Sequence, residues 1–132
     1  MTDTKDITCT KEISERLKIT PEVSLQSLHT LSELGITANY SGFFYTAYAV
    51  TLALEDPERL QLVTKWLYPD TARRYKTSID SIEKNIRTVC SLAWKRNPEL
   101  LMKMAGYRLE KKPSCSEFLA IISIYFFYQI VL

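Results

Sequence analysis

Apolar residues recur at three- and four-residue spacing in several stretches of the chain, which is typical of amphipathic helices and not of strands. The clearest case is the stretch 78–96, where one stripe is apolar and the opposite side is polar and basic. The apolar stripe consists of Ile79, Ile82, Ile86, Val89, Cys90 and Ala93. A short helix opened by Pro69 and a tight turn at Lys76-Thr77 come before it. This order of elements predicts a helix-turn-helix within residues 65–96.

Prolines, glycines and capping residues divide the rest of the chain into further helices. Thr20-Pro21-Glu22 predicts a helix start, and Gly35 its stop. Residues 42–55 are almost all apolar, which favours a buried central helix. The other boundaries are a start at Asp56-Pro57-Glu58, the end of the long helix at Asn97-Pro98, a short helix at Glu99–Ala105 and a last start at Ser114 with Glu117. The sequence therefore predicts an all-α fold, a compact bundle of about six helices that contains the helix-turn-helix.

The chain has 132 residues, which favours one domain with a core of its own. Residues 1–19 are polar and have no sustained period, so we expect an N-terminal arm there. We expect the helical domain over residues 20–132. Thr77 with Asp80 matches a capping box and predicts where the long helix of the helix-turn-helix begins.

Positive charge is concentrated on the predicted helix-turn-helix, although the net charge of the whole chain is only +2. Residues 65–96 hold eight Lys and Arg against three Asp and Glu, a net charge of +5, whereas residues 1–64 have a net charge of −4. Such a local excess suits a polyanion such as DNA. The candidate phosphate contacts are Arg73, Arg74, Lys76 and Ser78. Ordinary surface charge, and for Ser78 a capping role, are equally good interpretations of any one of them.

No arrangement of residues in the sequence predicts catalysis or a bound cofactor. Cys9, Cys90 and Cys115 have no metal-site spacing, and His29, the single histidine, has no recognisable partners. No glycine-rich phosphate loop or nucleophile motif is present. We therefore expect a protein that is not an enzyme, with no metal, cofactor or small-molecule substrate. The N-terminus has no signal peptide pattern, so we expect a cytoplasmic protein.

The last predicted helix, Phe118 to Leu132, is apolar on every side. One interpretation is a core helix packed on residues 42–55, and the other is a surface for a homodimer or for another regulator. The residues expected on that association surface are Phe118, Tyr125, Phe126 and Ile130. A membrane anchor is disfavoured, because fifteen residues span only ~22 Å as a helix against a hydrocarbon core of ~30 Å.

Several motifs, in order and nearly without gaps, give the chain a specific resemblance to a known family. They are Gly42-Phe43 with Tyr45, Leu67-Tyr68-Pro69-Asp70 with Ala72 and Tyr75, Glu83, Ile86-Arg87, Ala93-Trp94, Arg96, Gly106-Tyr107 and Ser116-Glu117-Phe118. From about Leu28 to Phe127, the chain resembles the C-terminal effector domain of stage 0 sporulation protein A, the sporulation response regulator of endospore-forming Firmicutes. The resemblance implies an all-helical domain that binds a short box of double-stranded DNA in the major groove and regulates transcription.

The resemblance also identifies the helix 78–96 as the recognition helix. The family reads Ser-Arg-Val-Glu-Arg-Ala-Ile-Arg where this chain has residues 80–87. Glu83 and Arg87 match, Glu83 as an acceptor from cytosine N4 and Arg87 as a base or phosphate contact. Ser81 and Lys84 stand where the family has two arginines. The residues implied in base reading are therefore Ser81, Glu83, Lys84 and Arg87.

Two hypotheses follow from these features. The first is a stand-alone, sequence-specific DNA-binding regulator without the family's receiver domain, because twenty residues before Pro21 are too few to form one. The second is a protein-interaction module that keeps the fold, has lost base reading, and modulates a sporulation regulator by association. The second hypothesis is motivated by the apolar C-terminus and by the two missing arginines, since the guanidinium fork of Arg reads guanine more specifically than Lys does.

Overall fold

The computed structural model describes residues 21–131, with side chains described for residues 25–129. Within that range, no residue lies in a strand, and six helices have eight or more residues. They are α2 (Pro21–Glu33), α3 (Ser41–Glu55), α5 (Tyr68–Tyr75), α6 (Ile79–Arg96), α7 (Pro98–Ala105) and α8 (Cys115–Val131). The all-α prediction of about six helices is confirmed. The arm predicted at residues 1–19 lies outside the described residues.

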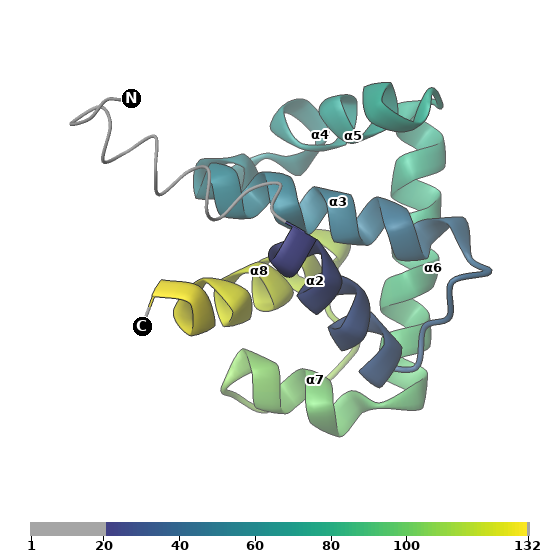
Figure 1. Ribbon diagram of the computed structural model, residues 1–132. Helices are drawn as coiled ribbons and strands as arrows, with labels where there is room; N and C mark the ends of the chain where they lie inside the picture. Colours follow the sequence, from purple (N-terminus) through teal and green to yellow (C-terminus); the bar gives the residue numbers. More distant parts are fainter. Residues whose placement is uncertain (1–20, 132) are drawn as a thin grey trace.

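Helix α3 lies in the middle of the bundle and packs against α2, α6 and α8. Figure 1 shows α6 running along one side of the molecule, with α5 at its N-terminal end and α7 at its C-terminal end. Ten of the fifteen residues of α3 are buried, which agrees with the central helix that its sequence predicts. The neighbours of α3 on several sides explain why it carries a single charged residue, Glu55 at its end.

Helices α3 and α6 approach each other closely at Gly42. A Cβ atom at this position would lie only 2.4 Å from the backbone oxygen of Asn85 and 2.6 Å from Cγ2 of Val89. Glycine is therefore required here by the contact between the two helices, because any larger residue would push them apart. This contact sets how far α6 stands from the centre of the bundle.

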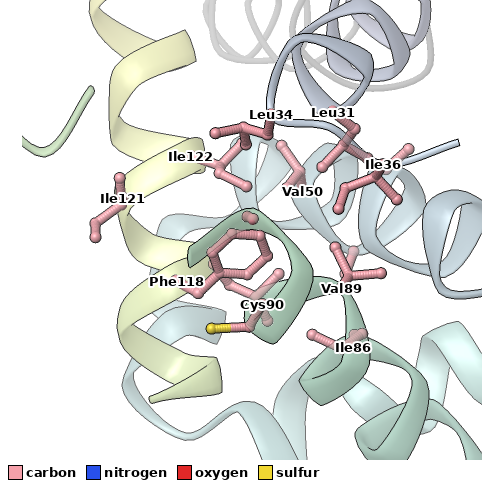
Figure 2. Close-up of a cluster of buried hydrophobic side chains, with 14 of the residues drawn as sticks. Leu31, Leu34, Ile36, Val50, Ile86, Val89, Cys90, Phe118, Ile121 and Ile122 are labelled. Atoms are coloured by element: carbon pink, nitrogen blue, oxygen red, sulfur yellow. The ribbon is translucent and has the colours of Figure 1, made fainter. Parts of the chain in front are cut away.

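The core joins α2, α3, α6 and α8 in one cluster (Figure 2). Leu31, Leu34 and Ile36 come from α2 and the turn after it, and they meet side chains of the three other helices. Those side chains are Val50 from α3, Ile86, Val89 and Cys90 from α6, and Phe118 and Ile122 from α8, whereas Ile121 points to the other side of α8. Most of the apolar stripe predicted for α6 is thus confirmed as a core face.

The C-terminal end of α6 is fixed to the end of α2 by two polar contacts. Nη1 of Arg96 donates a hydrogen bond to the carbonyl oxygen of Gly35 at 2.6 Å, and Nδ2 of Asn97 donates to that of Glu33 at 3.0 Å. Gly35 has a φ of 98°, as expected for the residue that ends α2. Arg96, counted above in the basic segment, thus makes a contact within the fold.

The segment between α3 and α5 differs from the single helix that the sequence predicts. It is divided into a 3₁₀ helix, η1 (Pro57–Gln61), and one turn of α-helix, α4 (Val63–Trp66). The start at Asp56 is confirmed, since its Oδ1 accepts a hydrogen bond from the backbone N–H of Glu58 at 3.3 Å. Val63 and Leu67 both reach the core, where they are 6% and 0% exposed.

Helix α8 packs on α3, as predicted, and also contacts α6, α7 and η1. The association surface predicted on it is wrong in part, because Phe118 and Phe126 are 0% and 2% exposed. Tyr125 is half-buried, and the side chain of Ile130 lies outside the described ones. Among the side chains of α8 that the structure describes, Ile124 and Tyr128 are exposed large apolar ones, at 50% and 57%. In the described part of the chain, no helix combines the length and hydropathy needed to cross a membrane.

Candidate nucleic-acid interface

Helices α5 and α6 are joined by a three-residue turn. The turn begins at Lys76, whose φ of 55° and ψ of 49° place it in the left-handed region. The backbone N–H of Thr77 donates to the carbonyl oxygen of Ala72 at 3.0 Å, which closes the end of α5. The arrangement of α5, turn and α6 is consistent with a helix-turn-helix.

Ser78 caps α6. Its Oγ accepts a hydrogen bond from the backbone N–H of Ser81 at 3.1 Å. The prediction that Thr77 caps this helix was therefore wrong by one residue, and the hydroxyl of Ser78 already has a partner within the fold. The residue after the cap, Ile79, was assigned to the buried stripe, but it is 40% exposed at the start of the helix.

The solvent side of α6 is centred on Lys84. The buried residues Ile82, Ile86 and Val89 define the opposite side, and successive residues are rotated by ~100° around a helix. Lys84 is exposed and makes no hydrogen bond or ion pair with the side chains that the structure describes. Its ammonium group is thus available to a ligand.

The four predicted base-reading residues do not form one compact group. Ser81 and Glu83, two residues apart, lie on opposite flanks of the side centred on Lys84. Glu83 accepts a hydrogen bond from Nη2 of Arg87 at 3.2 Å, so these two side chains are paired along one flank. On the other flank, Nδ2 of Asn85 donates to the carbonyl oxygen of Ser81 at 2.7 Å.

Two further polar residues of α6 belong to this surface and were not assigned a role from the sequence. Thr88 is exposed one turn after Lys84, and its hydroxyl donates to the carbonyl oxygen of Lys84 at 3.2 Å. Asn85 is half-exposed beside Ser81. Helical periodicity already placed both on the polar side, but residue type alone gave no reason to select them.

The predicted phosphate contact Arg73 is exposed on α5 and pairs with Asp70. Nη1 of Arg73 lies 2.7 Å from Oδ1 of Asp70, whose Oδ2 accepts from Nη1 of Arg59, also at 2.7 Å. The hydrogen bond from Arg59, reinforced by the one from Arg73, lowers the pKa of Asp70. Two guanidinium groups share one carboxylate here, so the cluster keeps a net positive charge.

Arg74 is held against aromatic rings. Its guanidinium carbon lies 5.4 Å from the ring centre of Tyr75 and 5.7 Å from that of Tyr48. The hydroxyl of Tyr75 donates to the carbonyl oxygen of Phe44 at 3.3 Å, and burial raises the pKa of Tyr75. Arg74 is therefore presented by α3 and α5 together. Lys76, in the turn, is exposed.

The loop before α8 adds a lysine to the same side of α6. Nζ of Lys112 donates to Oγ of Ser91 at 2.9 Å. The next residue, Pro113, is buried, and its carbonyl oxygen accepts from the Cys90 thiol at 3.3 Å. Burial raises the pKa of Cys90 to about 12, which keeps the thiol protonated so that it can donate.

A hollow of about 340 Å³ lies between α6 and this loop. Its charged lining residues are Glu83, Arg87 and Lys112, and Tyr68 and Cys115 also line it. The basic surface thus continues beyond the helix-turn-helix. Sequence reasoning did not find Lys112 because it lies twenty-one residues after Ser91 in the chain.

A comparison with protein families identifies what this arrangement belongs to. The family model described as "Sporulation initiation factor Spo0A C terminal" matches residues 28–126. The chain belongs to this family. The match runs from α2 into α8 and includes the whole α5–α6 unit.

Membership in the Spo0A C-terminal family makes this a DNA-binding effector domain of the sporulation type. The family is one of DNA-binding domains and not of enzymes. The resemblance inferred from the motifs between Leu28 and Phe127 is confirmed over almost the same residues.

Proposed function

We propose that this protein is a cytoplasmic, sequence-specific DNA-binding regulator of transcription that inserts α6 into the major groove. The observation that carries the proposal is Lys84, exposed and unpaired among the described residues, at the centre of the solvent side of a capped helix. In a helix-turn-helix, residues near the start of the recognition helix meet base edges. Lys84 lies in the second turn of α6, within reach of the groove floor.

Each predicted base-reading side chain of α6 has a different role in DNA recognition. Lys84 donates to guanine O6 or N7, and Glu83 accepts from cytosine N4. Arg87 contacts a base or a phosphate from the flank of α6 that it shares with Glu83. Ser81 donates or accepts a hydrogen bond to a base on the opposite flank. A single flexible ammonium reads guanine less strictly than a guanidinium fork, so we expect weaker discrimination than in relatives with two arginines.

Contacts to the DNA backbone come from α5 and the turn. Arg73 and Arg74 are exposed on α5, and Lys76 is exposed in the turn between α5 and α6. Ser78 is also exposed at the start of α6, where backbone N–H groups favour an anion. These contacts fix the register of α6 in the groove and supply most of the salt dependence of the affinity.

The test is a fluorescence-anisotropy titration of the purified chain with a duplex carrying the family's box and with a scrambled duplex, at several salt concentrations. We expect the box to bind more tightly. Lys84→Ala should weaken binding to the box by about 5- to 150-fold, the equivalent of one lost base contact of about 1–3 kcal/mol. Lys103→Ala, at an exposed lysine of α7, is the matched control and should change affinity little. Equal binding to both duplexes would refute specific recognition.

A second candidate function is a protein-interaction module that modulates another sporulation regulator or pairs with itself. It is favoured by the two exposed apolar side chains of α8, Ile124 and Tyr128. The test compares the mass in solution of the chain with that of the double variant Ile124→Ser, Tyr128→Ser. These substitutions spare Phe126, which the core needs. A monomer before and after the substitution would count against this function.

A further inference from the structure

We propose that Lys112, from the loop before α8, is a second DNA backbone clamp on the reading side of α6, outside the helix-turn-helix. The inference rests on the proposed function and extends the DNA-binding surface to a residue that belongs to neither α5 nor α6. The ligand is a phosphodiester of the duplex.

The position of Lys112 follows from its hydrogen bond to Ser91. Ser91 is seven residues, or almost two full turns, after Lys84 in α6. The two side chains therefore leave the helix in directions that differ by only ~20°, and they are separated by ~10 Å along the helix axis. Nζ of Lys112 lies 2.9 Å from Oγ of Ser91, so its charge lies on the line that runs from Lys84 down the exposed side. The two ammonium groups therefore face the same partner.

The charge of Lys112 is not compensated by a described carboxylate, whereas the charge of Arg87 is. Arg87 is paired with Glu83 at 3.2 Å, whereas no carboxylate among the described residues pairs with Lys112. The partner of Lys112 is a neutral hydroxyl, which a phosphate oxygen can replace or supplement. Both basic residues line the hollow between α6 and the loop, so Arg87 and Lys112 together outweigh Glu83 there.

The loop is fixed well enough to hold this position. Leu109 and Pro113 are buried on either side of Lys112, and the Cys90 thiol donates to the carbonyl oxygen of Pro113. A lysine on a fixed loop loses less freedom on binding than one on a mobile loop. Lys111, by contrast, is exposed and makes no hydrogen bond or ion pair with the described residues, which makes it a matched control.

Geometry indicates a phosphate and not a base as the partner. When the first turns of a recognition helix reach the groove floor, its later turns leave the groove beside the DNA backbone. The major groove is about 12 Å wide, similar to the distance from Lys84 to Ser91 along the helix. Arg73, Arg74 and Lys76 then contact the backbone near the start of α6, and Lys112 contacts it near the end.

The experiment measures the affinity of the full chain for the box duplex between about 50 and 200 mM salt for Lys112→Gln, Lys111→Gln and Lys112→Arg. One lost phosphate contact lowers the slope of log K against log salt by about 0.9 and weakens binding by about three- to tenfold at low salt. We expect this for Lys112→Gln only, with the affinity and slope kept by Lys112→Arg. Ser91→Ala, which retains the charge but removes its anchor, should give a smaller loss with an unchanged slope.

The outcomes separate this proposal from the function on which it rests. If Lys84→Ala weakens binding but Lys112→Gln and Lys111→Gln give the same slope and affinity, the clamp is refuted and the recognition helix stands. If the unmodified chain does not bind either duplex at low salt, both are refuted. A thermal unfolding curve for each variant checks that the fold is kept, which we expect because Lys112 is exposed.

Discussion

Helices α6 and α8 have similar lengths, 18 and 17 residues, and both begin at a serine cap, yet they relate to the rest of the molecule differently. Helix α6 buries one stripe and leaves a polar side to solvent, where Lys84 and Arg87 are exposed. Helix α8 has no polar side and meets α3, α6, α7 and η1. Helix α6 can therefore offer a surface to a ligand without cost to the core, whereas most of α8 cannot.

The difference teaches that apolarity along a helix does not by itself indicate a binding surface. Phe118 and Phe126 are as apolar as Ile124 and Tyr128, but the first pair fills the core and the second pair faces solvent. What distinguishes the pairs is which neighbouring helix covers each side of α8. On α6 the polar residues mark the uncovered side directly.

The largest expected effect distinguishes the two sides of α8. Phe118→Ala and Phe126→Ala each remove a buried aromatic ring and should lower the free energy of unfolding by about 3–5 kcal/mol. Tyr128→Ala, on the exposed side of the same helix, should change it by no more than about 0.5 kcal/mol. Urea unfolding followed by circular dichroism measures all three. Similar losses for Phe126→Ala and Tyr128→Ala would contradict the burial of Phe126 and the exposure of Tyr128.

The next effect concerns the contact that holds α6 at its distance from α3. Gly42→Ala places a Cβ atom 2.4 Å from the backbone oxygen of Asn85, so the helices must separate. We expect a loss of about 1–3 kcal/mol in the free energy of unfolding, as for other overpacked sites. Ser41→Ala, at the exposed neighbouring position, is the control and should be within about 0.5 kcal/mol of the unmodified chain. Equal stability of the two variants would show that α3 and α6 do not make the close contact at Gly42.

The serine caps allow a matched comparison of the two helices. Oγ of Ser78 accepts from the N–H of Ser81, and Oγ of Ser114 accepts from the N–H of Glu117, both at 3.1 Å. Ser78→Ala and Ser114→Ala should each cost about 1 kcal/mol of unfolding free energy, because each leaves an N–H without its side-chain acceptor. Only Ser78→Ala should also weaken DNA binding, since it loosens the start of the recognition helix. A DNA-binding loss of the same size for Ser114→Ala would contradict that assignment.

The smallest expected effect is the contribution of Asp70, in α5, to the pH dependence of stability. Because Arg59 and Arg73 lower the pKa of Asp70, the folded protein binds a proton at Asp70 more weakly than the unfolded chain does. Stability from this group is therefore present above the unfolded pKa of about 3.9 and is lost as the pH falls through the lower folded pKa.

Asp70→Asn should consequently lose stability near neutral pH and show a weaker decline than the unmodified chain in the acid range. Denaturant unfolding between about pH 2 and pH 7 measures this difference. Glu110→Gln, at an exposed carboxylate, serves as the control and should follow the decline of the unmodified chain. An Asp70→Asn profile parallel to that of the unmodified chain would exclude the proposed coupling to the two arginines.

The sequence by itself determined the helical class, most helix boundaries and the concentration of positive charge on residues 65–96. These features depend on local physics, because helical period, proline and glycine positions and capping residues act over a few neighbours. The same information placed Lys84 on the polar side of α6 and Arg87 at the edge of that side. The errors at this level were small, such as the cap at Thr77 in place of Ser78 and the single helix expected after Asp56.

Only the tertiary structure decided which charged and apolar residues remain free for a partner. Arg96 belongs to the basic segment but is used to hold Gly35, and Arg73 is shared with Asp70. Phe118 and Phe126 are covered, whereas Lys112 is brought over Ser91 from twenty-one residues away. Such contacts join residues distant in the chain, so they depend on how whole helices pack and not on any local pattern.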